Sequence, residues 1–291
     1  MALRRYLLMK LNERNDYPKL NINKDIKEPL NTQGFNYYSM PLTGVEVEVE
    51  NFTTQLDPLP SHSWRVETDG SLRNRGVEFI SKPTEPKHIE SAITYLFDDI
   101  LNQRNHFSPR TSIHVHLNCR ELTFDQVYNI VILYQCFEDL LYSFAGPERK
   151  KSIFCIPVGN TDYYNALKTL MKAETLPTWS KYTGLNLGPL REYGTIEFRH
   201  LRGTRNKFVV FDWLHILYKL YTFAISLETE ELEKLIHNTT VSHDYFGLGY
   251  AVFGTHFLTL TRDASYEKTM KTDMTISRLF SYKKPNLEGY I

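Results

Sequence analysis

Apolar and polar residues alternate along four stretches of the chain, as they do in strands that turn one face toward a core. The clearest stretch places Val45, Val47 and Val49 on one side and glutamates on the other. We therefore expect four strands. They cover residues 43–51, 76–81, 112–118 and 193–200.

Apolar residues that recur every three or four positions predict helices between and after these strands. Thr123 and Gln126 match a capping box, which opens a long helix that Gly146 and Pro147 end. The pattern over 240–291 is mixed. Further helices are expected over 86–105, 161–173, 208–227 and 228–238.

The segment 208–227 is apolar enough to raise the question of a membrane span. Its polar residues follow one another at steps of three and four, so they share one stripe of a helix, which we expect on its outer face. A charged side chain in the middle of a bilayer would cost about 2.5–3.5 kcal/mol. We therefore predict an amphipathic core helix in a soluble protein. The stripe consists of Asp212, His215, Lys219, Thr222 and Ser226.

Strands and helices are interspersed without a regular strand–helix–strand alternation, which favours an α+β fold with a mainly antiparallel sheet. We divide the chain into an N-terminal arm over 1–40, a main domain over 41–239 and a C-terminal extension over 240–291 that packs on the domain. The oligomeric state is not readable from the sequence.

The charges of the chain cancel, with 34 Lys and Arg against 34 Asp and Glu. A protein that binds nucleic acid or an anionic membrane would carry an excess of basic residues, so we expect neither partner. The 3 cysteines show no CxxC spacing, which argues against a disulfide framework or a cysteine zinc site. This cysteine usage favours a reducing compartment such as the cytoplasm.

The polar faces of the four predicted strands carry the candidate chemistry. Taken singly, each is an ordinary solvated face or a cross-strand ion pair, but on one sheet they form a surface of carboxylates, imidazoles and a guanidinium. Clustered carboxylates attract Mg²⁺, and a neighbouring arginine suits phosphate oxygens. We therefore predict metal-assisted phosphoryl transfer with a nucleotide as donor. The residues are Glu46, Glu48, Glu78, His114, His116, Glu197 and Arg199.

Other charged residues near these strands are expected to play smaller parts. Glu50 continues the first strand but lies beyond the carboxylate cluster, so we expect it in solvent. The basic run 149–151 is expected in a solvated loop. Arg202 follows the fourth strand, where it either contacts phosphate or belongs to a basic surface.

Several short motifs, in a specific order, resemble those of a known family. The segment GVEVE at 44–48 resembles the opening strand of carboxylate–amine ligases with the glutamine synthetase fold, and in particular the amidoligase family common in bacteriophages and their hosts. The resemblance covers about 43–227. Its one departure is Thr111-Ser112, where a glycine is usual. The other motifs are DGSL at 69–72, GVEFISKP at 76–83, SIHVH at 112–116, GLNL at 184–187, GTIEFR at 194–199 and GT at 203–204.

The resemblance implies a glutamine synthetase-like fold, with an antiparallel curved sheet and helices packed on its convex side. It implies ATP and two Mg²⁺ or Mn²⁺ ions as cofactors. His116, Arg199 and Arg202 would contact the nucleotide, Asp69 and Asn186 would lie near the acceptor substrate, and His116, Arg199 and Asp69 would be catalytic. The metal ligands would be Glu46, Glu48, Glu78, His114 and Glu197.

The implied reaction is amide formation. ATP phosphorylates a carboxylate, and an amine attacks the acyl phosphate, so that a peptide, protein or amino acid is modified in the cytoplasm of a bacterial cell. Two alternatives stay open. One is a phosphotransferase of the same fold that acts on an amine or guanidino group, and the other is a non-catalytic phage structural or binding protein.

Overall fold

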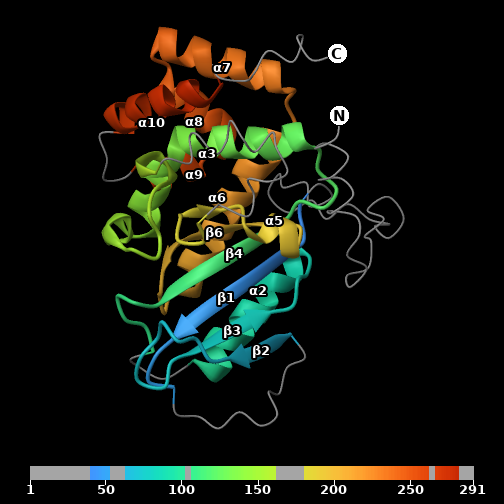
Figure 1. Ribbon diagram of the computed structural model, residues 1–291, viewed down its shortest axis with the longest axis vertical. Helices are drawn as coiled ribbons and strands as arrows, with labels where there is room; N and C mark the ends of the chain where they lie inside the picture. Colours follow the sequence, from blue (N-terminus) through green and yellow to red (C-terminus); the bar gives the residue numbers. More distant parts are fainter. Residues whose placement is uncertain (1–39, 53–62, 102–105, 162–179, 262–265, 282–291) are drawn as a thin grey trace.

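The computed structural model describes residues 40–52, 63–101, 106–161, 180–261 and 266–281 (Figure 1). The expected N-terminal arm and the helix expected over 161–173 lie outside these residues, except for Met40 and Thr161.

Within the described residues, six strands form one open antiparallel sheet in the order β2-β3-β1-β4-β6-β5. The α+β class and the antiparallel sheet are thus confirmed. Four strands coincide with the predicted ones, while β2 and β5 are too short to show an alternation. The strands are β1 (Thr43–Val49), β2 (Trp64–Glu67), β3 (Val77–Ser81), β4 (Ser112–Asn118), β5 (Leu185–Asn186) and β6 (Thr195–Arg202).

The helices occupy most of the predicted positions. The capping box is present, since the Thr123 side chain accepts from the Gln126 amide at 3.2 Å, and the helix ends at Ala145. The described part of 240–281 is helical rather than mixed. The elements are α2 (Pro86–Tyr95), a π-turn (Leu96–Ile100), α3 (Phe124–Ala145), α5 (Pro189–Glu192), α6 (Lys207–Ile225), α7 (Thr229–Ser242), α8 (Tyr245–Phe253), α9 (His256–Leu260) and α10 (Tyr266–Ser281).

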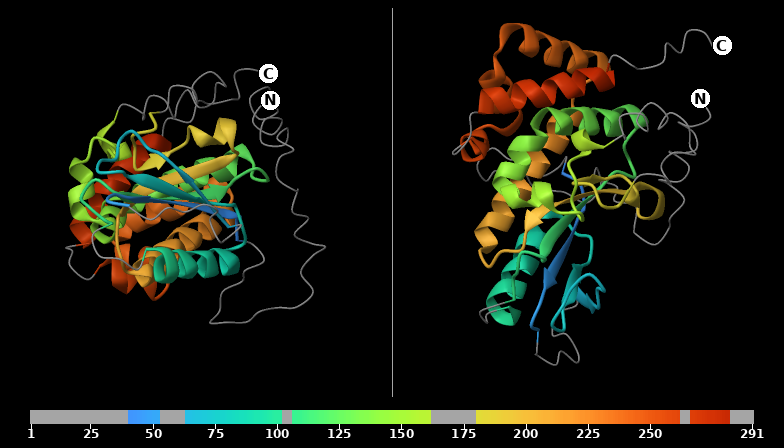
Figure 2. Two further views of the ribbon diagram at one scale, coloured as in Figure 1. Left: turned by 90° about the horizontal axis from the view of Figure 1, so that it is seen from below. Right: turned by 60° about the vertical axis from the view of Figure 1, so that its left-hand side comes forward.

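Helices α2 and α6 cover one face of the sheet, and α7, α8 and α10 pack beyond α3, away from β2 (Figures 1 and 2). Tyr218 on α6 donates a hydrogen bond of 2.8 Å to the Thr43 hydroxyl, which ties this helix to β1. On α10, Asp273 accepts from the Asp139 amide of α3 at 2.9 Å. The sheet face opposite α2 and α6 is left to polar side chains.

Helix α6 is the one helix of the described residues that is long and apolar enough to cross a membrane by length and composition. Half of its most apolar window is buried inside the protein, as in the core helix of a soluble protein. Trp213 is fully buried and stacks on Phe144 of α3 at 5.8 Å between ring centroids. The polar stripe of α6 is not an open outer face, because His215 contacts Glu90 of α2.

Candidate metal and phosphate site

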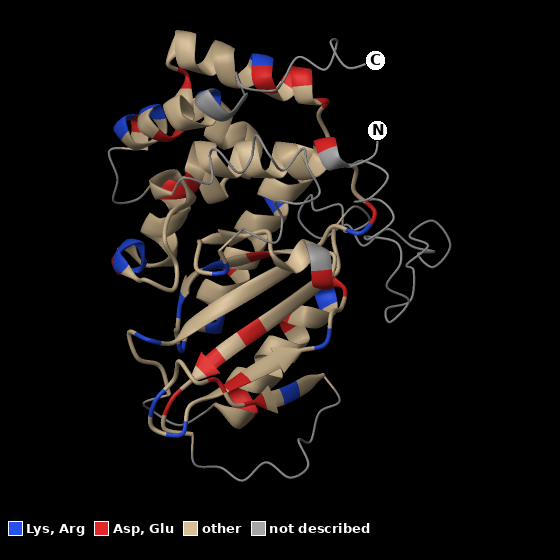
Figure 3. Cartoon of the chain, in the orientation of Figure 1, with Lys and Arg blue, Asp and Glu red and all other residues tan. Residues whose placement is uncertain are grey.

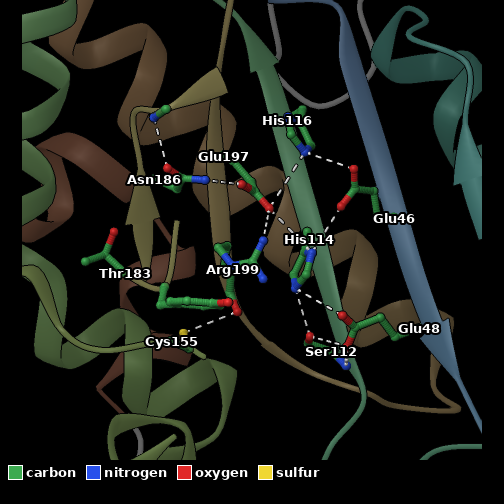
Figure 4. Close-up of polar contacts among 12 residues, drawn as sticks. Glu46, Glu48, Ser112, His114, His116, Cys155, Thr183, Asn186, Glu197 and Arg199 are labelled. Atoms are coloured by element: carbon green, nitrogen blue, oxygen red, sulfur yellow. Dashed lines mark hydrogen bonds and ion pairs between the residues drawn. The ribbon is translucent and has the colours of Figure 1, made fainter. Parts of the chain in front are cut away.

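Strand register brings the predicted residues onto the open face of the sheet. Glu46 on β1 lies opposite His114 on β4, and Glu48 lies opposite Glu78 on β3. Directly opposed residues of antiparallel strands share a face, so these side chains meet. His116 lies opposite Glu197 on β6 in the same way. Figure 3 shows acidic residues gathered on this part of the sheet, and Figure 4 shows the side chains turned toward one another.

His114 lies at the centre of the cluster. Its Nδ1 is 3.1 Å from Glu46 Oε2 and 3.4 Å from Glu197 Oε1. Its Nε2 is 2.8 Å from the Ser112 hydroxyl, which in turn donates to Glu48 Oε2 at 2.6 Å. One imidazole therefore links carboxylates from β1 and β6 and, through Ser112, a second carboxylate of β1.

Glu197 connects the other half of the site. Its Oε1 binds the Arg199 guanidinium, and its Oε2 accepts from the Asn186 amide at 2.5 Å. The Asn186 oxygen accepts from the Gly188 amide at 2.9 Å, which fixes the orientation of the side chain. The predicted residues Asn186, Glu197 and Arg199 thus form one chain of contacts across β5 and β6.

Strand β6 carries a bulge beside the site. The register shifts between Ile113 and Val115 of β4, so that Arg199 and His200 together oppose His114. Arg199 shares a face with Glu197, two residues before it, and points into the site. His200 is fully buried on the helix side, 2.7 Å from the Tyr134 hydroxyl. The extra residue changes the alternation only after His200, since Leu201 is also fully buried.

Arg149 holds the bulge. Its Nε donates to the His200 carbonyl at 3.1 Å and its Nη2 to the Arg199 carbonyl at 3.1 Å. The side chain is 3% exposed, so the prediction of a solvated basic run is wrong at this residue. Its neighbours differ, because Lys150 pairs with Asp139 at 2.7 Å and Lys151 is exposed.

Charges within the cluster shift several pKa values. Burial by itself raises the pKa of Glu46, but hydrogen bonds and positive charge from His114 and His116 outweigh burial and hold that pKa well below its usual value. Burial likewise opposes ionisation of Glu197, yet His116, Arg199 and His114 bring its pKa below the ordinary value. Burial lowers the pKa of His116, but Glu46 and Glu197 raise it by more, so that the pKa of His116 lies above its ordinary value. Glu46 and Glu197 are therefore ionised at neutral pH.

Glu78 behaves in the opposite way. Burial first, and then the negative charges of Glu46, Glu48 and Asp69, raise the pKa of Glu78 to about 9. No positive group is among these causes. A carboxyl group that keeps its proton because it is buried and other carboxylates surround it marks a place where a cation is favourable.

Three overlapping groups in this cluster bring one ligand atom from each residue within 4.8 Å of the others. The group of Glu48, Asp69 and Glu78 offers oxygen alone, which suits Mg²⁺ or Mn²⁺. The others add an imidazole, and they are Glu46, Glu78 and His114, and Glu46, His116 and Glu197.

One buried nitrogen atom supports this fit. The Nε of Arg199 has no hydrogen-bond partner among the described residues, which leaves a donor for a phosphate oxygen. A buried polar atom without a partner is costly unless a ligand satisfies it. The Nε2 of His116 differs, because it lies 3.2 Å from Glu46 Oε1 and 3.8 Å from Glu197 Oε1.

The structure also places Asp69, Arg202 and Glu50. Asp69 joins Glu48 and Glu78 and so stands among the carboxylates. Arg202 is 53% exposed and lies 3.6 Å from Glu148, outside the cluster. Glu50 is 4% exposed instead of solvated, because the strand ends at Val49 and the Glu50 carboxylate accepts from the Arg73 amide at 2.9 Å.

Ser112 and Thr195 were not expected in the site. Ser112 bridges Glu48 and His114, and the Thr195 hydroxyl lies 3.1 Å from His116 Nδ1. Each stands two residues before a predicted site residue on the same strand. Because residues two apart on a strand share a face, the alternation predicts that both side chains lie on the face of the site.

Replacing Arg149 with methionine is expected to weaken the fold and the site together. The change leaves the Arg199 and His200 carbonyls without their charged donor, and such hydrogen bonds contribute about 1.5–3 kcal/mol. We expect a lower unfolding free energy by about 2 kcal/mol, measured by denaturant unfolding, and weaker Mn²⁺ binding at the sheet site, measured by titration. Lys151→Met, which alters an exposed neighbour, is the matched control. Equal stability of the two variants would remove the assigned role of Arg149.

The fold and the site define a class: an α+β protein with an open antiparallel sheet, whose exposed face carries acidic and histidine groups able to hold a metal ion. Comparison with protein-family models gives no match. Comparison with curated protein sequences gives no match either.

Proposed function

We propose that this protein is an ATP-dependent carboxylate–amine ligase with a glutamine synthetase-like fold that uses Mg²⁺ or Mn²⁺. The observation that carries the proposal is the cluster of Glu46, Glu48, Glu78 and Glu197 on one sheet face with Arg199 beside it. Together with the ordered motifs, this arrangement favours phosphoryl transfer over the other uses of an acidic sheet face.

The residues divide into cation ligands, residues that contact the phosphates, and one residue that orients a ligand. Glu48, Asp69 and Glu78 would hold one cation, while Glu46, His114 and Glu197 would hold a second. When bound, these cations neutralise charge on a transferring phosphoryl group. His116 and Arg199 lie at the arginine end of the cluster, where we place the nucleotide phosphates, and Asn186 keeps Glu197 in its orientation.

The proposed reaction has two steps and needs no oxidant or reductant. A substrate carboxylate oxygen attacks the γ-phosphorus of ATP and ADP leaves, which gives an acyl phosphate. An amine nitrogen then attacks the acyl carbon, phosphate leaves and the nitrogen loses a proton. The products are an amide, ADP and phosphate.

We place the substrates among peptides, proteins and amino acids of a bacterial cytoplasm, with neither nucleic acid nor membrane as a partner. The chain carries no excess of positive charge for a polyanion. Cations held by the clustered carboxylates, together with Arg199, would suit a nucleotide and a carboxylate substrate.

Incubation with ATP, Mg²⁺ and pools of amino acids and peptides is expected to give a product lighter by one water than its two parts, detected by mass spectrometry. Hydroxylamine, as a general amine acceptor, is expected to trap the activated carboxylate as a hydroxamate with one ADP formed for each. A stable phosphorylated amine or guanidine without hydroxamate would instead identify a phosphotransferase. No ADP above that of a Glu197→Ala variant would refute the enzyme.

A further inference from the structure

A second group of side chains able to bind a metal lies away from the sheet site, on α6 and α9. Asp212 and His215 belong to α6, and His256 is the first residue of α9. One ligand atom of each lies within 4.8 Å of the others. His256 lies 41 positions after His215 in the sequence, so the fold brings the two helices together here.

Local structure explains the convergence. Asp212 and His215 are three residues apart, which places them on one side of α6. Gly254, with φ +57°, turns the chain between α8 and α9 and carries it close to Lys219, so that His256 faces α6. The His215 and His256 rings lie 5.7 Å apart between centroids at an angle of 80°, so two imidazoles approach one region from different directions.

Two features of the histidines point to a ligand in this region. His215 Nε2 lies 2.8 Å from Glu90 Oε1, a carboxylate oxygen that accepts a hydrogen bond. Histidine ligands of metals are commonly oriented by a carboxylate in this way. On His256, the Nδ1 atom is buried and has no hydrogen-bond partner within the described part of the chain.

We propose that Asp212, His215 and His256 form a binding site for a transition-metal ion of the zinc class, with Glu90 as the orienting carboxylate. Two imidazoles and one carboxylate are a common three-residue ligand set for Zn²⁺, to which water adds a fourth ligand. The site does not depend on the proposed ligase activity, since it shares no residue with the sheet cluster.

Lys219 is the charge that opposes this site. It stands one turn after His215 on α6, and burial lowers its pKa. Its ammonium also acts on His256, whose pKa is lowered by burial first and then by the charges of His215 and Lys219. Two carboxylates, Asp212 and Glu90, set against one ammonium keep the local charge favourable for a divalent cation. Removal of the Lys219 charge should therefore tighten binding.

A bound ion would join α9 to α6. Within the described residues, α9 has only five residues and is too short to be stable alone. The ion would cross-link it to the long helix α6, whose His215 also contacts Glu90 of α2. Its effect would be seen as a higher melting temperature rather than as catalysis.

The test is zinc binding by the whole chain, measured by dialysis against Zn²⁺ with excess Mg²⁺ present, followed by metal analysis. The unaltered protein is expected to bind one more equivalent of Zn²⁺ than the His256→Ala and Asp212→Asn variants. Lys219→Gln is expected to bind this equivalent several-fold more tightly. Co²⁺ should give strong visible absorption from a four-coordinate ion, which the two ligand variants lose.

His88→Ala is the matched control, because His88 is an exposed histidine of α2, the helix that carries Glu90. It should retain the equivalent, as should Glu197→Gln, which alters only the sheet cluster. Circular dichroism checks that each variant is folded. If His256→Ala does not fold, Asp212→Asn provides the test. Equal zinc content of the unaltered protein and both ligand variants, or no bound zinc in any of them, would overturn the proposal.

Discussion

Glu197→Ala is expected to abolish divalent-cation binding at the sheet site and to lower nucleotide hydrolysis by at least about 100-fold. Glu197 contacts His114, His116, Asn186 and Arg199, more partners than any other carboxylate of the cluster in the described chain. Its removal deletes a metal ligand and also releases Arg199 from its fixed position. Both losses act on the same transferring phosphoryl group.

The experiment is a Mn²⁺ titration followed by electron paramagnetic resonance, together with ADP release at saturating Mg²⁺. Glu67→Ala is the matched control, since Glu67 lies opposite Glu78 on the edge strand β2 but is exposed and paired with Arg65 at 3.0 Å. Glu197→Gln, which keeps the shape and the acceptor oxygen, should lose most of the hydrolysis while keeping the fold. Hydrolysis by Glu197→Ala equal to that of Glu67→Ala would refute the assigned role.

Cation affinity is expected to rise about tenfold for each pH unit between pH 6 and 8. Burial and the neighbouring carboxylates raise the pKa of Glu78 to about 9, so this group holds a proton at neutral pH and must release it to a metal ion. Glu46 and Glu197, with lowered pKa values, are already ionised in this range and add no slope. Titration of Mn²⁺ at pH 6, 7 and 8 measures the slope, and calorimetry in buffers of different ionisation enthalpy counts the proton.

Without metal, the free energy of unfolding is expected to fall as the pH rises, whereas the cation affinity rises. The folded pKa of Glu78 lies above the unfolded value of about 4.5, so the folded state binds more protons between these values and stability falls as pH rises toward about 9. His116, whose pKa is also raised, acts in the same direction above its unfolded pKa. Glu78→Gln should flatten the affinity slope and reduce the fall in stability to the part that His116 contributes, and Glu67→Gln should leave both unchanged. An unchanged slope in Glu78→Gln would show that another group releases the proton.

Much of the sheet was predictable because side-chain alternation is a local property. Val45, Val47 and Val49 are all fully buried, and the glutamates between them face the site, as their period of two requires. The same reasoning placed His114 and His116. Helix α3 was predictable from its capping box and from the glycine that follows its last residue.

Other features depended on neighbours that no local pattern identifies. Glu50 lies one residue beyond a strand with the correct alternation, yet its carboxylate is used by the Arg73 amide, which approaches from another segment. Arg149 belongs to an ordinary basic run, and its burial follows from the two carbonyl groups that the β6 bulge turns toward it. Charge runs alone carry no information about such partners.

Residue type and spacing were enough to assign the strands, the polar face of each and the candidate ligands, because these follow from the geometry of a single strand. The register between strands decided which ligands meet, since a shift of one residue would turn a whole strand's side chains to the other face. Tertiary packing also decided the proton held by Glu78 and the meeting of Asp212 and His215 with His256. Electrostatic energy depends on distance through space, and distance along the chain does not fix it.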